Sequence, residues 1–168
     1  MKKIVFAQIM FLSLITLSSC DLFAKQVSVD TWLNSATSCK DTAYKSAEVK
    51  TVTILNGNKQ TRTDKWTYSN GEWDGPASLQ TIMVPGIRAV DLASFFLDLS
   101  YDTENYSVKF YSNLKVELKE KGSSIFAEYK FNSYGYMTGY KSEDLATSYG
   151  IFATHDGTTV TISYNPLW

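Results

Sequence analysis

The stretch YSVKFYSNLKVELKEKGSSIFAEYKF, residues 106–131, decides the fold of this 168-residue chain. Apolar and polar side chains alternate along it in three runs that are separated by short polar turns. Because successive side chains of a strand point to opposite faces, each run has one apolar and one polar face. This pattern is typical of an antiparallel sheet that is covered on one side only. Residues 106–131 therefore predict three consecutive antiparallel strands.

Further strand and turn signals lie on both sides of this stretch. Val49–Leu55 is rich in β-branched residues, Asn56-Gly57 is a hairpin turn signal, and the chain returns over Gln60–Tyr68. Asn70-Gly71 then leads into a short strand at Glu72-Trp73. Beyond residue 131, strands are predicted over 136–141 and, as a hairpin across the turn 155–157, over 151–154 and 158–164.

Two segments have helical spacing. The first predicted helix begins near Thr31, with Ser28 or Asp30 as its N-cap, and its apolar positions recur every three or four residues. These positions are Trp32, Ala36, Cys39, Ala43 and Ala47. Polar residues between them allow a break near Asp41. The second predicted helix covers 87–99, which is apolar on nearly all sides and should be buried on most of them.

The order of these elements predicts a single α+β domain over residues 28–168. It consists of an antiparallel sheet, either open or bent into a half-barrel, with two helices packed on one face. The 149 residues that follow residue 19 are enough for one domain with a sizeable core.

The chain begins with the features of an export signal. Lys2 and Lys3 precede an apolar run over 4–17, which matches the core of a secretory signal peptide and is too short to span a bilayer. The tetrapeptide Leu17-Ser18-Ser19-Cys20 then resembles the lipobox of bacterial lipoprotein precursors. In that family the cysteine thiol receives a diacylglycerol, with fatty chains such as palmitate, and the signal peptide is removed just before it. The resemblance implies that 1–19 are the signal peptide, that Cys20 is lipidated and that 20–27 form a tether.

This resemblance implies a location in the cell envelope, on the extracytoplasmic side of a cell membrane that holds the fatty chains. Ordinary secretory cleavage fits the sequence less well, because Ala24 has the bulky Leu22 two positions before it. Once Cys20 carries lipid, Cys39 is the one thiol left. It is either a buried small side chain or a site for pairing between chains.

The charge balance argues against a nucleic-acid partner. The full chain has 16 basic and 17 acidic side chains, and removal of residues 1–19 takes Lys2 and Lys3 away. This leaves 14 basic and 17 acidic side chains, a net charge of about −3. No basic patch stands out in the sequence, so we do not expect binding to nucleic acid.

A surplus of aromatic residues provides the candidate ligand-binding residues. Trp66, Tyr68 and Trp73 fall on neighbouring predicted strands around one hairpin. Flat aromatic faces bind sugars or line apolar clefts. The alternative is that the same rings pack against one another across the strands.

Candidates for catalysis or metal binding have weak support. His155 is the single histidine and lies in a predicted turn, where no other group is expected to hold it as a general base. Asn70, Glu72 and Asp74 loosely follow the start of a calcium-binding loop. The position that requires a bidentate glutamate is Thr81. We therefore predict no catalytic residue, no metal ligand and no cofactor, and leave an enzymatic activity open.

The element order, with hairpins such as 131–136, also resembles the Lol-type lipoprotein carriers and related half-barrel lipoproteins. In these proteins a curved antiparallel sheet wraps helices and encloses an apolar cleft for acyl chains. The resemblance implies that the helix with Phe95 and Phe96 packs in the concave face, and that the short tether keeps the cleft near lipid.

Two hypotheses for the function follow. The first is a membrane-tethered, non-enzymatic binding protein for an apolar or amphiphilic ligand, such as a lipid. The alternative is a surface adhesion or interaction module whose aromatic strands contact a glycan or another protein.

Overall fold

The computed structural model describes residues 24–55, 57–76, 83–124, 126–143 and 155–167. The elements within these residues are β1 (Gln26–Val27), α2 (Val29–Ser38), β2 (Tyr44–Leu55), β3 (Asn58–Ser69), β4 (Glu72–Asp74), α3 (Ala93–Tyr101), β5 (Tyr106–Tyr111), β6 (Val116–Glu120), β7 (Phe126–Phe131), β8 (Met137–Glu143) and β9 (His155–Pro166). The predicted signal peptide over 1–19 and the predicted lipidation site Cys20 lie outside the described residues. In the described part of the chain, no helix has both the length and the apolar character needed to cross a membrane.

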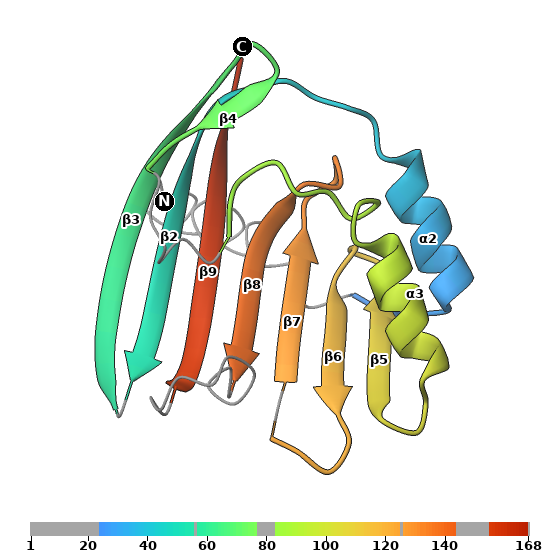
Figure 1. Cartoon of the computed structure of the whole chain (residues 1–168). Coiled ribbons are helices and arrows are strands. Elements are labelled where there is room, and N and C mark those ends of the chain that lie inside the picture. The colour runs from blue at the N-terminus through green and yellow to red at the C-terminus, as the bar shows by residue number, and fades with distance from the viewer. Residues whose placement is uncertain (1–23, 56, 77–82, 125, 144–154, 168) are drawn as a thin grey trace, which may run out of the picture.

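All of these strands join one sheet, in which every neighbouring pair is antiparallel (Figure 1). The spatial order is β1-β5-β6-β7-β8-β9-β2-β3-β4. As far as the described residues go, β1 and β4 are the two edges and the sheet does not close into a barrel. The last strand, β9, joins the hairpin β2–β3 to the run β5–β8. The predicted sheet-rich α+β fold is confirmed at this level, including the three consecutive strands over residues 106–131.

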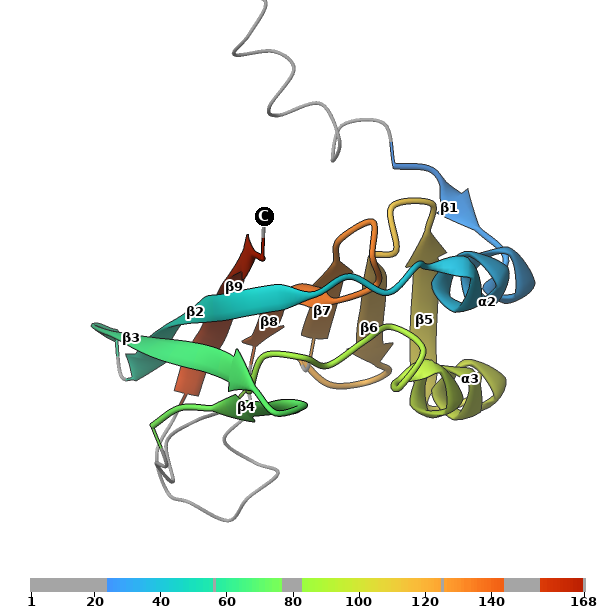
Figure 2. The same cartoon turned by 90° about the horizontal axis from the view of Figure 1, so that it is seen from above.

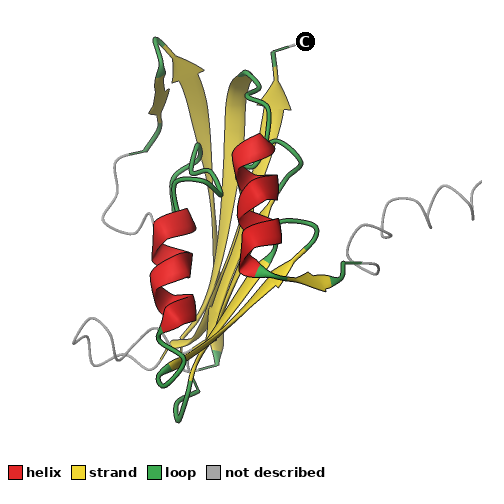
Figure 3. Ribbon diagram, turned by 90° about the vertical axis from the view of Figure 1, so that its right-hand side faces the viewer, coloured by secondary structure: helices red, strands yellow, loops and turns green. Residues whose placement is uncertain are grey.

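Both helices pack at the β5 end of the sheet (Figure 2, Figure 3). Trp32 of α2 lies at the centre of the core that they form with the sheet. Its ring centroid is 5.7 Å from that of Phe96 in α3, 5.3 Å from Phe110 in β5 and 6.4 Å from Phe131 in β7. A fully buried side chain of this kind contributes about 1.5–3 kcal/mol, so these rings are the main attachment of the helices to the sheet.

The first helix is shorter than the sequence spacing predicts. Ser28 caps α2 as expected, since its Oγ accepts a hydrogen bond from the backbone N of Thr31, but the helix ends at Ser38. Ala47 lies in β2, where it is buried between the neighbouring strands. The predicted extension of the helix over Ala43–Ala47 is therefore wrong. A small apolar side chain fits a helix stripe and an inner strand face equally well, and pairing with β3 and β9 decides between them.

The second helix is also shorter, because α3 begins at Ala93 rather than at Ile87. The residues before it bond to the turn between β7 and β8. Ala89 N donates to Gly135 O at 2.7 Å, and Met137 N donates to Ile87 O at 2.8 Å. These backbone bonds hold the segment 85–91 against the end of the sheet.

The predicted hairpin turn at 155–157 is wrong. These residues lie in β9, where His155 pairs with Leu55 and Gly157 pairs with Ile54 across a local irregularity in register. The predicted arm over 151–154 lies outside the described residues. An Asp-Gly pair is a local turn signal, whereas the long strand β2 offers backbone partners that keep these residues extended.

Candidate functional site

A cleft of about 750 Å³ lies at one end of the sheet. It is bounded by the segment that follows α2, by the β3–β4 hairpin and by the segment 85–91. We call it the aromatic cleft. Its aromatic and charged lining residues are Asp41, Tyr44, Tyr68, Trp73, Arg88, Asp91 and Tyr136. They come from parts of the chain that are distant in sequence, so the cleft exists only once the sheet has formed.

Five aromatic rings form a continuous series of contacts at this cleft. Tyr68 and Trp73 pack across the β3–β4 hairpin with their centroids 5.1 Å apart, and Trp73 contacts Tyr164 at 5.9 Å. Tyr164 in turn lies 4.6 Å from Tyr44 and 5.7 Å from Tyr136. Tyr68 is 40% exposed, whereas Tyr44 is buried. The series is therefore fixed by packing at one end and accessible to a ligand at the other.

Arg88, Asp41 and Tyr136 form a polar cluster in the same cleft. Arg88 Nη1 lies 2.9 Å from Asp41 Oδ1, and Tyr136 Oη donates to the same oxygen at 3.0 Å. The Arg88 guanidinium lies 5.3 Å from the centroid of the Tyr136 ring, and its Nη2 donates to the carbonyl oxygen of Cys39 at 3.2 Å. The Asp41 side chain is 77% exposed. The cluster thus presents a carboxylate that is held in place and open to solvent.

Backbone geometry fixes this cluster beside the rings. Arg88 N donates to Asp91 Oδ2 at 2.8 Å, and Gly86 N donates to Tyr164 Oη at 3.1 Å. Gly86 has a positive φ of 96°. A Cβ at this position would lie 2.6 Å from Trp73 Nε1. Glycine is therefore needed for the backbone to approach the Trp73 ring so closely.

The tyrosines of the cleft are held in the neutral form. Burial raises the pKa of Tyr136 to about 12, and its hydrogen bond to Asp41 adds to this effect. Burial also raises the pKa of Tyr164 to about 12. Both phenols therefore remain protonated near neutral pH. Among the described lining residues, Asp41 and Asp91 outnumber the single cation Arg88, so the cleft has a net negative formal charge.

The structure brings two of the predicted ligand-binding residues into the aromatic cleft, Tyr68 and Trp73. Trp66 belongs to the same hairpin but is only 8% exposed and lies in the core. Phe96 is fully buried, and Phe95 is 43% exposed on α3 without lining the cleft. Ligand binding by these residues remains a prediction, and the geometry supports it best for Tyr68 and Trp73.

Sequence reasoning did not identify Asp41, Arg88 and Tyr136 as members of one site. The helical spacing predicts a helix that includes Arg88 and allows one that reaches Asp41, while Tyr136 is predicted simply as the start of a strand. The local signal that was present is Pro85-Gly86, which marks a change in chain direction just before Arg88. Arg88 and Tyr136 lie 47 and 95 positions from Asp41 in the sequence, and no local pattern encodes these contacts.

Cys39 lies close to this site but does not line it. Its Sγ donates to the carbonyl oxygen of Ser35 at 3.3 Å. The Cys39 side chain also packs against Gly135, where an added Cβ would lie 3.2 Å from the Cβ of Cys39. Burial raises the pKa of the Cys39 thiol. These contacts favour the interpretation of Cys39 as a packed small side chain.

Other possible sites are less distinctive. A second concavity of about 930 Å³ lies between the end of α2 and the turns at 111–115 and 131–135, and hydroxyl, amide and lysine side chains provide most of its lining. In the described ranges, no group of three or more His, Cys, Asp or Glu side chains is placed to hold a metal ion.

The sequence matches no protein-family model, and no curated protein is detectably similar to it. The class of the protein is therefore defined by its fold and its site. It has an open antiparallel sheet with two short helices and an aromatic, acidic cleft at one end of the sheet.

Proposed function

We propose that this chain is a lipid-anchored, non-enzymatic binding protein of the cell envelope whose aromatic cleft holds a saccharide. The observation that carries the proposal is the presence, in one open cleft, of accessible aromatic rings and a fixed set of hydrogen-bonding groups. A sugar ring has an apolar face of C–H groups and a rim of hydroxyls. It can therefore stack on an aromatic ring and bond to polar side chains at the same time.

Each part of the cleft has a role in this proposal. Tyr68 and Trp73 provide the stacking platform, because both line the cleft, where Tyr68 is exposed and half-buried Trp73 packs against it. Asp41 accepts hydrogen bonds from sugar hydroxyls, and Arg88 and Tyr136 hold its carboxylate in position. The net negative charge of the cleft suits a neutral saccharide better than an anionic one.

An acyl chain enclosed by a half-barrel has less support as the ligand. In the Lol-type proteins that the sequence resembles, an apolar cavity lies between the sheet and its helices. The corresponding space here contains Trp32, Phe96 and Met137, each at most 1% exposed. The aromatic cleft is lined by carboxylates and a guanidinium as well as rings, and burying such groups against an acyl chain would cost free energy.

The anchor is supported by the signal-like sequence and by the lipobox at Leu17–Cys20. We expect Cys20→Ser to release the protein from membranes under a high-salt wash, because the fatty chains on Cys20 are the hydrophobic attachment and salt screens any attraction between charges. Fractionation of cells that produce the full chain tests this. Retention of the variant on membranes after a high-salt wash would contradict the anchor.

The cleft is tested by screening neutral oligosaccharides on an array and measuring the best one by isothermal titration calorimetry. We expect Trp73→Ala to weaken binding at least about tenfold, a loss of about 1.4 kcal/mol, because it removes the platform. Phe95→Ala is the matched control, since Phe95 is an exposed aromatic residue outside the cleft. An equal loss in both variants, or no binding of any oligosaccharide, would contradict the proposal.

A further inference from the structure

The outer face of the sheet, opposite the helices, carries an excess of lysine near the point where the chain enters the domain. Strands β5 to β8 and the residue just before β6 contribute eight charged side chains to this face. They are Lys109, Lys115, Lys119, Lys130, Lys141, Glu117, Glu128 and Glu143. We call these eight residues the basic face. They alternate along the strands with the buried side chains of the core, such as Val116, Leu118 and Ala127.

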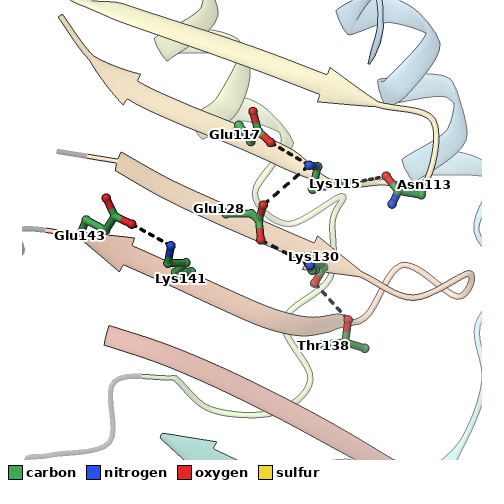
Figure 4. Close-up of polar contacts among 8 residues, drawn as sticks. All are labelled: Asn113, Lys115, Glu117, Glu128, Lys130, Thr138, Lys141 and Glu143. Carbon is green, nitrogen blue, oxygen red and sulfur yellow. Dashed lines mark hydrogen bonds and ion pairs between the residues drawn. The ribbon is translucent and has the colours of Figure 1, made fainter. Parts of the chain in front are cut away.

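The glutamates of the basic face are already paired with lysines. The ion pairs are Lys115–Glu117 at 2.7 Å, Lys115–Glu128 at 3.7 Å, Lys130–Glu128 at 3.5 Å and Lys141–Glu143 at 2.7 Å (Figure 4). Lys109 and Lys119 are exposed, and neither forms an ion pair within 4.0 Å of a described carboxylate. Lys109 lies opposite Glu117 in the sheet and is one of the charges that lower the pKa of Glu117. The basic face therefore has two more positive than negative charges, whereas residues 20–168 as a whole carry a net charge of about −3.

Two aromatic rings lie among these charges. Lys115 Nζ is 4.0 Å from the centroid of the Tyr111 ring, and Lys141 Nζ is 6.0 Å from that of Phe126. Lysine and tyrosine side chains are typical of protein surfaces at the level of lipid headgroups, since each has an apolar part and a polar end. Phe126 adds an apolar ring to this surface.

The chain enters the domain beside this face. β1 pairs with β5, and Lys25 exchanges two hydrogen bonds with Ser112, from Ser112 N to Lys25 O at 2.9 Å and from Lys25 N to Ser112 Oγ at 3.1 Å. The five steps from one residue to the next between Cys20 and Lys25 reach about 18 Å at most when fully extended. A lipid on Cys20 would thus keep the start of β1 within about 18 Å of the bilayer surface. A tether at less than half of this reach brings it within about 8 Å, the Debye length at physiological salt, where charges attract with little screening.

We propose that the basic face docks on the anionic phospholipid surface of the membrane that holds Cys20. The proposal rests on the anchor of the proposed function. The tether keeps this face near the bilayer, and the attraction of its unpaired lysines to anionic headgroups orients the domain. The helices then lie on the far side of the sheet from the lipid.

The experiment uses the full chain, processed and lipidated by the producing cell and added to preformed vesicles. The vesicles contain phosphatidylcholine either alone or with phosphatidylglycerol. A membrane-impermeant amine-acylating reagent, followed by peptide mass spectrometry, reports the accessibility of each lysine. We expect Lys109 and Lys119 to react several-fold more slowly on the anionic vesicles, and high salt to remove this difference. Lys40, exposed on the segment after α2, should react equally on both.

A pair of matched variants distinguishes an effect of the basic face from an effect of the net charge of the chain. Lys119→Glu and Lys40→Glu change the charge of the chain by the same amount, and both positions are exposed. We expect Lys119→Glu to speed the labelling of Lys109 on anionic vesicles about fivefold or more, the factor that corresponds to about 1 kcal/mol for one basic residue near such a surface. Lys40→Glu should leave that labelling unchanged.

Three other results would each contradict either the docking of the basic face or the lipid anchor. Equal labelling of Lys109 on both kinds of vesicle overturns the docked face and leaves the anchor intact. A protein that binds neither kind of vesicle overturns the anchor and with it the docked face. Protection that appears on neutral vesicles only after a DNA duplex is added would identify a soluble polyanion as the partner, and would overturn docking on lipid.

Discussion

Asn132, at the start of the turn between β7 and β8, holds two of the tyrosines that line the aromatic cleft. Its Oδ1 accepts hydrogen bonds from the backbone N of Tyr134 and of Tyr136, each at 3.0 Å, and its Nδ2 donates to Tyr44 Oη at 3.0 Å. We expect Asn132→Ala to lower the free energy of unfolding by about 2–4 kcal/mol. Three hydrogen bonds contribute about 0.5–1.5 kcal/mol each, and the substitution also deprives two backbone N–H groups of their partner.

Asn132→Asp is the matched variant, because it has nearly the same size and keeps both acceptor interactions. It loses only the donor to the Tyr44 hydroxyl, which can itself donate to the new carboxylate. We therefore expect Asn132→Asp to lose no more than about 1 kcal/mol. The two variants thus separate the acceptor role of Oδ1 from the donor role of Nδ2.

Urea unfolding followed by far-ultraviolet circular dichroism measures these differences. The midpoint should decrease in the order wild type, Asn132→Asp, Asn132→Ala, with an unchanged dependence of the free energy on urea concentration. A loss below about 0.5 kcal/mol for the alanine variant would refute the reasoning, because a surface substitution without such contacts has an effect of that size. Equal losses in the two variants would also refute it.

Three further predictions concern the core, the pH dependence and the thiol. Gly75→Ala should lower the free energy of unfolding by about 1–3 kcal/mol, because the new Cβ would lie 2.2 Å from a ring carbon of buried Trp66. Gly139→Ala, whose nearest contact would be 3.5 Å, should change thermal stability little, and equal effects would contradict the packing argument. The pKa of Tyr164 is about 12 in the folded protein against an ordinary value of 10.0, so the contribution of Tyr164 to stability should be fully present below pH 10 and be lost as pH rises from 10 to 12. Urea unfolding at a series of pH values checks this, and a flat profile in that range would count against it. Cys39 should react with iodoacetamide more slowly in the folded than in the unfolded chain, and equal rates would show that it is not shielded.

The local patterns in the sequence were sufficient to predict most of the strands. Residues 106–131 alternate between apolar and polar side chains, and β5, β6 and β7 follow that alternation with their apolar side chains toward the core. The return of the chain over residues 60–68 and the capping of α2 by Ser28 were also predictable. These features depend on residues within a few positions of one another, so their physical cause is contained in the local sequence.

Pairing between distant segments decided the rest. Ala47 fits a helix stripe by its spacing, and its place in β2 follows from pairing with Trp66 in β3 and Tyr164 in β9. Arg88 lies in a segment with helical spacing, and bonds to the turn between β7 and β8 hold that segment out of α3. In both cases the local preference was small compared with the hydrogen bonds and burial that distant segments provided, long strands for Ala47 and a turn for Arg88.

The sequence by itself determined that this chain forms a sheet with one apolar face, because the alternation of side chains is a local property. Only the tertiary structure decided where the functional surfaces lie. The aromatic cleft joins Asp41, Arg88 and Tyr136, and the basic face joins Lys109 with Lys141 through the register of four strands. The net charge and composition of the chain are the same whichever strands are neighbours, so neither surface could be read from them. Strand order and register bring these charges and rings together, since they determine which distant residues share a face.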